Sequence, residues 1–296
     1  MMARTKTARS AAKARIGIIG GSGLYEMEGF KAQRRVRVRT PFGEPSDAVT
    51  VGSLNGVDVA FLARHGAGHR HSPTQIPYRA NIHAMKQLGV ERILSVSAVG
   101  SMKETIHPGE LLIPDQFYDH TKHRVSTFFD NGIVAHVAFG DPVCPELTGA
   151  LVQACHGRGF AAHEGGTYLC MEGPQFSSRG ESLIYRQWGV DVIGMTNATE
   201  AKLAREAEIC YATLALVTDY DCWHQEESDV TVEAVIKLLH ENVAKAKQVL
   251  AAVVPTIAAG RGCRCGEALR YAIITRPEAV SARAKTRLKL LLAGRG

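Results

Sequence analysis

Asp219 and Asp221, separated by one residue, are the pair of side chains in this sequence best suited to bind a planar polar ligand. They follow an apolar run over residues 212–217 that predicts a buried strand. In an extended chain residues two apart point to the same face, so both carboxylates would project from the carboxyl end of this strand, where open α/β sheets bind ligands. Two adjacent carboxylates suit adjacent polar positions such as N7 and the 6-amino group of a purine. For an arbitrary Asp-x-Asp, two surface carboxylates at the start of a loop are the commoner explanation. Whether this pair binds a ligand therefore has to be judged from the rest of the chain.

Three further segments supply groups that could bind an anion. Residues 15–23 predict a short strand that breaks into a glycine turn, where backbone N–H groups can approach an anion closely. An Arg-His pair follows a predicted hairpin at residues 48–63, and small residues end a strand at residues 91–100. The arginine suits an oxyanion because its charge is permanent and its N–H groups form a fork. The turn is not G-x-G-x-x-G, which disfavours a dinucleotide site, and a plain strand-to-loop turn remains an alternative. The candidate anion-binding residues are Ser22, Arg64, His65, Ser97 and Ala98.

Two groups of residues invite a metal interpretation. Glycines at 66 and 68 argue against a helix that would align His65 with His69, and no carboxylate follows closely, so we expect an anion there rather than a metal. Cys263 and Cys265 form a Cys-x-Cys that could be a redox pair or half of a metal site, but no second pair completes a zinc set. We therefore predict no metal ligands.

Strand and helix patterns alternate along the chain, which predicts one α/β domain. The clearest local signals are Asn-Gly at 55–56, typical of a hairpin turn, and Ser178 with Glu181, typical of a capping box. Asn197 with Glu200 indicates the start of another helix. Further helices are expected at 78–88, 145–156 and 231–253, and further strands at 109–115, 166–171 and 191–196.

The net charge of +6 is concentrated at the two ends of the chain. Residues 1–15 and 281–296 each carry five Lys or Arg and no acidic residue, so the remainder is slightly acidic. A basic nucleic-acid-binding surface is therefore not expected, although association through the basic ends is kept as an alternative of another class. No apolar run is long enough for a membrane span, and seven cysteines, an odd number, fit a reducing compartment. We expect a cytoplasmic protein with neither nucleic acid nor membrane as a partner.

Six motifs together carry a family resemblance that covers roughly residues 15–255. They are residues 18–24, 40–43, 63–66, 172–179, 191–196 and 218–223, the last being especially specific. The chain resembles the 5′-methylthioadenosine phosphorylases, a family among the trimeric purine nucleoside phosphorylases. The resemblance implies a homotrimer and a single-domain α/β nucleoside phosphorylase fold with a mixed central sheet flanked by helices. We divide the chain into a disordered basic tail at 1–15, the phosphorylase domain at 16–255, and a helical extension at 256–296 packed on the same domain.

The resemblance also implies roles for individual residues. Phosphate would be bound by the five anion-site candidates together with Thr196, although family members often have Thr where Ser22 and Ser97 stand. Asp219 and Asp221 would bind N7 and the 6-amino group. A further departure is Ala198-Thr199, where the family has Pro before Glu200. The remaining implied substrate contacts are Met195 under the ribose, Phe176 beside the purine, Thr218 and Tyr220 next to the aspartates, His69 near the 5′ end, and His136 reaching the 5′ end across a trimer interface; Ser177 and Val232 would shape specificity.

These residues predict phosphorolysis of 5′-methylthioadenosine to adenine and 5-methylthioribose 1-phosphate, with inorganic phosphate as co-substrate and no cofactor. Asp219, with its pKa raised by Asp221 and by burial, would donate a proton to N7 as the purine departs. A 6-oxopurine nucleoside or methylthioinosine phosphorylase is the nearest alternative, and an Asn in place of one Asp would have favoured it. A phosphate-independent nucleosidase is disfavoured by the anion-site residues.

Overall fold

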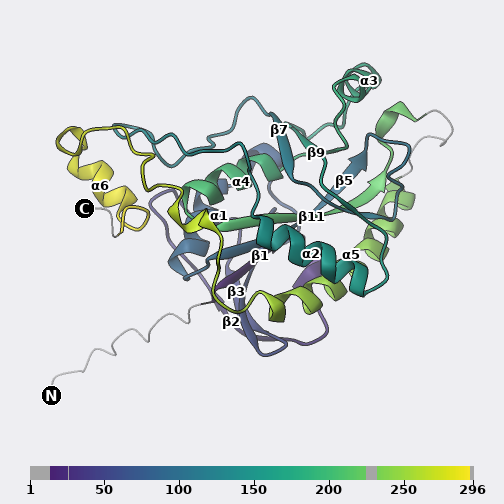
Figure 1. Cartoon of the computed structure of the whole chain (residues 1–296), viewed down its shortest axis with the longest axis horizontal. Coiled ribbons are helices and arrows are strands. Elements are labelled where there is room, and N and C mark those ends of the chain that lie inside the picture. Colours follow the sequence, from purple (N-terminus) through teal and green to yellow (C-terminus); the bar gives the residue numbers. More distant parts are fainter. Residues whose placement is uncertain (1–13, 26, 225–231, 294–296) are drawn as a thin grey trace.

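A mixed β-sheet with helices on both faces forms the centre of the computed structural model, which describes residues 14–25, 27–224 and 232–293 (Figure 1). Eleven strands are assigned within the described residues. They are β1 (Ile16–Gly20), β2 (Phe30–Val36), β3 (Val49–Leu54), β4 (Val57–Ala63), β5 (Arg92–Ser101), β6 (Leu111–Ile113), β7 (Gln116–His120), β8 (Ala162–Glu164), β9 (Thr167–Met171), β10 (Val192–Gly194) and β11 (Cys210–Asp219). The predicted mixed sheet is confirmed.

Four strands at the centre of the sheet run parallel and set the position of the site. β1 pairs in parallel with β4 and β5, and β5 pairs in parallel with β11. The carboxyl ends of these four strands therefore meet at one edge of the sheet. β5 extends beyond β1 there and pairs antiparallel with β10, which continues to β9 and β7.

Alternating side chains of the central strands separate two hydrophobic cores, because successive residues of a strand point to opposite faces. Ile19 belongs to a core with helices α1 (Tyr78–Gln87) and α4 (Asn197–Glu206). Ile16 and Ile18 belong to a second core with helices α2 (Pro145–Gly157) and α5 (Val232–Thr256). Because both faces are covered, β1 is buried throughout, as expected for a central parallel strand. Helix α3 (Arg179–Gln187) lies outside these two layers (Figure 1).

The local sequence signals for turns and caps are confirmed. Asn55 and Gly56 both have positive φ, 49° and 85°, and join the antiparallel strands β3 and β4. Ser178 and Glu181 form the capping box at the start of α3. The strand expected at 109–115 is shorter, since only Leu111–Ile113 pairs with its neighbours as β6.

The C-terminal segment after α5 packs on the first core. Leu269, Ala272 and Val280 are buried there, and α6 (Ala282–Leu288) contributes Ala284 and Leu288. At the other end, residues 1–13 lie outside the described part, so the predicted basic tail is not described there; Arg15 pairs with Glu91 at 2.7 Å. The division of the chain into tail, domain and extension stays a prediction. None of the described helices is long and apolar enough to cross a membrane.

Candidate active site

Ala98 is exposed at the edge where β1, β4, β5 and β11 end. β5 is buried at nine of its ten positions, and Ala98 is the exposed one. Its partner on β11 is Leu216, three residues before Asp219. An exposed residue within an otherwise buried central strand indicates a recess beside the carboxyl end of β11.

Asp219 and Asp221 flank this recess by a different geometry from the one predicted. β11 ends at Asp219, and Asp221 opens a short 3-10 helix (Asp221–Trp223) with a left-handed φ of 44°. The extended same-face arrangement is therefore wrong, because the chain turns at once after the strand. The turn still brings the pair together, since the Asp221 N–H donates to Oδ1 of Asp219 at 2.9 Å.

Gly100 of β5 makes room for both aspartates. A Cβ atom at Gly100 would lie 2.8 Å from Oδ1 of Asp219 and 3.4 Å from Cβ of Asp221. The pairing of Gly100 with Asp219 follows a bulge in β11 between Val217 and Asp219. The absence of a side chain at Gly100 thus decides where the Asp219 carboxylate lies.

Burial raises the pKa of Asp219, so this carboxyl group holds its proton to a higher pH than an exposed aspartate does. Hydrogen bonds from the Thr218 hydroxyl at 2.7 Å and from the Asp221 N–H oppose this shift. The predicted contribution of burial is confirmed, whereas the Asp221 N–H lowers the pKa of Asp219. Burial and the charge of Asp219 raise the pKa of Asp221, while Ser182, whose hydroxyl donates to Oδ2 at 2.6 Å, lowers it.

Arg64 lies beside β5 in a buried ion pair with Glu200. Its Nε donates to Oε1 of Glu200 at 2.6 Å, Nη1 to the Val96 carbonyl at 2.8 Å, and Nη2 to Ser95 Oγ at 2.6 Å. Burial alone would lower the pKa of Arg64, but the Glu200 carboxylate outweighs it and raises the pKa. Glu200 was expected to help open α4; instead it is 1% exposed and holds Arg64. Direct binding of an oxyanion by Arg64 stays a prediction.

A buried amide fixes the start of α4 beside β5. Nδ2 of Asn197 lies within 3.1 Å of Ser95 Oγ and of the side-chain oxygens of Tyr211 and Thr213, and Oδ1 accepts from the Thr196 hydroxyl at 3.0 Å. This network places Thr196, the residue before α4, at the helix end where N–H groups attract anions.

The Tyr168 hydroxyl connects two of the predicted phosphate-binding residues. It lies 3.5 Å from Ser97 Oγ and takes a backbone hydrogen bond from Thr196. Ser97 and Thr196 therefore meet at one buried tyrosine, and Ala98 follows Ser97 on β5.

His65 is held neutral and in one tautomer. Its Nδ1 lies 2.9 Å from the His71 carbonyl, so Nδ1 carries the hydrogen and Nε2 is left as an acceptor. Burial, with a smaller contribution from the Arg64 charge, lowers the pKa of His65 to about 4. The ring stacks on His69 with 4.0 Å between centroids. A neutral His65 would accept a hydrogen bond from a protonated phosphate oxygen through Nε2.

The Met195 loop is positioned by Arg124, which the sequence did not single out. Nη1 of Arg124 donates to the Met195 carbonyl at 2.5 Å, and Nε donates to Glu172 at 3.1 Å. Sδ of Met195 lies against Gly173, where a Cβ would approach it to 2.6 Å. Arg124 thus joins the loop after β10 to the loop after β9.

The loop after β9 carries the predicted purine-stacking and specificity residues. Phe176 is 81% exposed and lines a surface pocket together with Met171 and Tyr185. The Ser177 carbonyl accepts from Cys222 Sγ at 3.2 Å, which joins this loop to the turn that carries Asp221. The pocket itself does not include Asp219 or Asp221 among its lining residues.

Four predicted residues have other placements. The Tyr220 ring is buried and stacks on His224 at 4.6 Å. His136 is exposed, and its N–H donates to the Ala272 carbonyl, so it lies beside the C-terminal segment; its reach into a neighbouring subunit stays a prediction. Ser22 begins a 3-10 turn and Val232 begins α5, but both side chains lie outside the described residues.

One expectation about cysteines is wrong. Cys144 and Cys210 complete a four-thiol cluster with Cys263 and Cys265. A motif search could not find this second pair, because its members are 66 residues apart and meet only in the folded chain.

A family model described as the phosphorylase superfamily matches residues 15–255. The chain belongs to this superfamily. S-Methyl-5′-thioadenosine phosphorylase of Koribacter versatilis is 59% identical over 280 residues, covering 95% of this chain and 96% of its own. The enzyme of the same name from Geobacter sulfurreducens is 58% identical, covering 94% and 97%.

Solved structures agree with this assignment and with the fold. A methylthioadenosine phosphorylase from an antarctic soil metagenomic library is 54% identical with a TM-score of 0.91, covering 96% of this chain and 100% of its own. The Schistosoma mansoni methylthioadenosine phosphorylase in complex with adenine is 34% identical with a TM-score of 0.83, covering 90% and 100%. The nucleoside phosphorylase fold predicted from the motifs is confirmed.

Proposed function

We propose that this enzyme cleaves 5′-methylthioadenosine with inorganic phosphate to give adenine and 5-methylthioribose 1-phosphate. The observation that carries the proposal is the partly buried Asp219, which lies beside Ala98 at the carboxyl end of β11 and whose raised pKa suits a proton donor. The names of the relatives at 58% and 59% identity support the same substrate.

The reaction needs charge stabilised at both ends of the glycosidic bond. Phosphate at Ser97, Ala98 and Thr196 would offset the positive charge that develops on the ribose and would then attack C1′. Asp219 would give its proton to N7, which neutralises the departing purine. Holding both substrates together removes much of the entropic cost of their meeting. No step requires a metal or an organic cofactor.

Other side chains of the site would orient the nucleoside. Met195, fixed by Arg124, would lie under the ribose, and exposed Phe176 would cover the purine once substrate binds. Asp221 would accept from the 6-amino group while Ser182 holds its other oxygen. A 6-oxopurine offers an acceptor at that position, so an ionised Asp221 would repel it.

We also propose that the enzyme works as a homotrimer. His136 is exposed beside the C-terminal segment, where its N–H donates to the Ala272 carbonyl, and its side chain would reach the substrate of an adjacent subunit. Sedimentation as a monomer would contradict this assembly.

Purine release from three nucleosides tests the proposed function. With phosphate present, we expect adenine release to be fastest from methylthioadenosine and slower from adenosine. Hypoxanthine release from methylthioinosine should be at least about tenfold slower than adenine release from methylthioadenosine, because one misplaced hydrogen bond costs about 1.4 kcal/mol or more. Without phosphate, release should cease. Faster release of hypoxanthine than of adenine would favour a 6-oxopurine nucleoside phosphorylase. Cleavage without phosphate would contradict the assignment of the anion site.

Replacing Gly100 tests whether the space beside Asp219 matters. In Gly100→Ala the new Cβ would meet Oδ1 of Asp219 at 2.8 Å, so the carboxyl group must move. We expect kcat to fall by roughly 10- to 100-fold with little change in thermal stability, because small misplacements of a reacting group are costly. Gly140→Ala, where nothing lies within 4 Å of the new atom, is the matched control. Equal kcat values for both variants would show that Asp219 does not depend on this space.

A further inference from the structure

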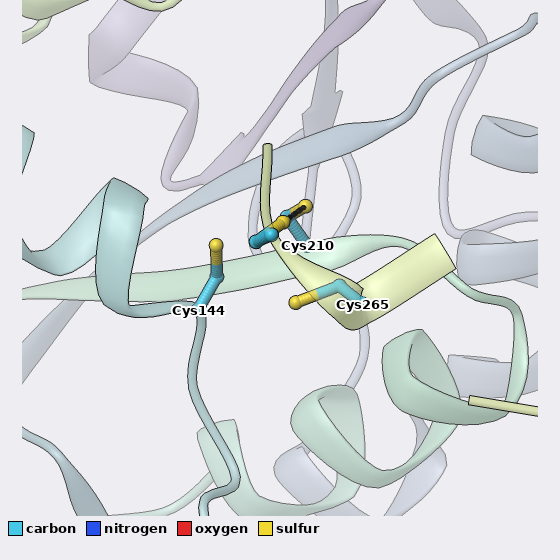
Figure 2. Close-up of side chains that lie close together, drawn as sticks. Cys144, Cys210 and Cys265 are labelled. Carbon is cyan, nitrogen blue, oxygen red and sulfur yellow. Dashed lines mark hydrogen bonds between the residues drawn. The ribbon is translucent and has the colours of Figure 1, made fainter. Parts of the chain in front are cut away.

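Four cysteines from three separate parts of the chain place their sulfur atoms together. Cys144 precedes α2, Cys210 is the first residue of β11, and Cys263 and Cys265 belong to the segment after α5. All four Sγ atoms lie within 4.8 Å of one another, and Sγ of Cys210 and Cys263 are 3.3 Å apart. The sulfurs of Cys144 and Cys265 turn toward the space beside Cys210 (Figure 2).

We propose that these four thiolates form a structural Zn²⁺ site. Zinc with four Cys ligands is tetrahedral with bonds of about 2.3 Å, which places the sulfurs about 3.8 Å apart, so only small side-chain movements separate the observed cluster from that geometry. Zinc binding would displace the thiol protons to solvent. Four protein ligands leave no open position, which is typical of a structural and not a catalytic site.

Two hydrogen-bond donors lie close to the sulfur atoms of the cluster. Cys144 precedes the first turn of α2, where the Leu147 N–H donates to its sulfur, and Nη1 of Arg261 lies 3.9 Å from Sγ of Cys210. Nearby positive groups are needed because a zinc ion with four thiolates carries a net charge of −2.

The backbone around the cluster is fixed by residues that do not themselves bind the metal. Arg92, the neighbour of Cys210 on β5, donates to the carbonyls of Ile257, Ala259 and Gly260. Glu146 accepts from the Gly262 N–H at 2.9 Å. The segment is therefore held in place up to Cys263, as a preorganised ligand set requires.

The site would anchor the C-terminal segment and would act on stability, not on chemistry. Cys210 and Asp219 stand at opposite ends of the ten-residue β11, which separates the cluster from the candidate active site by about 30 Å. Beyond Cys265 the chain goes on to pack Leu269 and α6 on the first core. Losing the metal should therefore loosen this segment while the active-site edge keeps its geometry.

Elemental analysis of the full-length enzyme, purified with a thiol reductant and without an affinity tag, tests the proposal. We expect about one zinc per chain in the wild type, and in Cys155→Ala, which removes a buried cysteine outside the cluster. Cys265→Ser and Cys263→Ser should lose the zinc and melt several degrees lower, with turnover near the wild-type value at low temperature. Cobalt(II) added to metal-free wild type should give the visible bands of tetrahedral thiolate coordination, absent from Cys265→Ser.

Other results would overturn the assignment. The zinc assignment is contradicted if the wild-type enzyme contains no metal and also fails to bind cobalt, or if it contains iron in place of zinc. It is also contradicted if mass analysis, after alkylation under denaturing and non-reducing conditions, finds the four cysteines paired as disulfides and not alkylated. If Cys265→Ser fails to fold, the metal content and the cobalt spectra of the wild type still show whether the four cysteines bind zinc.

Discussion

Replacing Asp219 with Ala should lower kcat by about 10³-fold, equivalent to about 4 kcal/mol of transition-state stabilisation, while KM for the nucleoside changes little. The reason is that a proton donor to the leaving purine acts mainly in the transition state. Steady-state purine release measures both parameters. Asp58→Ala, at an exposed aspartate on β4, is the control and should behave as the wild type.

The pH profile of the same variants identifies the protonation state. Asp219 is an acid with a raised pKa, so its proton is present below that pKa and lost as pH rises through it. Wild-type kcat should therefore fall on the alkaline side, and Asp219→Asn should lack this limb. An Asp219→Ala variant with unchanged kcat, or a wild-type rate that rises with pH over this range, would contradict the acid role.

Glu200→Gln should destabilise the fold by about 3–5 kcal/mol, the largest stability loss that we expect from a single substitution. Its side chain is 1% exposed and pairs with Arg64, itself 4% exposed, so removing the charge leaves a buried guanidinium unpaired. Urea unfolding followed by circular dichroism measures the change. Glu104→Gln, which breaks the exposed pair with Arg186, should cost less than about 1 kcal/mol.

A double variant separates stability from function at this pair. Arg64→Met combined with Glu200→Leu removes both charges and should recover much of the stability that Glu200→Gln loses. If Arg64 also attracts phosphate, the folded double variant should show a raised KM for phosphate. A stable Glu200→Gln would mean that Arg64 finds water or another partner, against the burial observed here.

Several features of the fold follow from local sequence alone. Asn55-Gly56 sets the hairpin because both residues tolerate positive φ, and Ser178 with Glu181 starts α3 because their side chains satisfy the free N–H groups of the helix end. The apolar strands and the rule that parallel strands share a carboxyl edge place Arg64, Ser97 and Asp219 towards the carboxyl ends of nearby strands. These signals depend on residues a few positions apart, so they can be predicted from the local sequence.

The tertiary structure decided what those residues experience. The left-handed turn at Asp221, the burial that raises the pKa of Asp219, and the space at Gly100 depend on how β5 and β11 meet. Glu200 lies 136 residues from Arg64, and no local pattern reveals that it neutralises that charge. Arg124 has no sequence signal at all, because its partners, two backbone carbonyls and the Glu172 carboxylate, belong to distant loops.

The cysteines show the same division most clearly. The sequence determined that Cys263 and Cys265 are separated by one residue and are therefore able to share a ligand. Only the folded chain brings Cys144 and Cys210 to them, since the start of α2 and the start of β11 become neighbours through the packing of the second core. Residue types and short spacings fix which chemistry is available, whereas partners, burial and charge compensation arise from contacts between residues far apart in the chain.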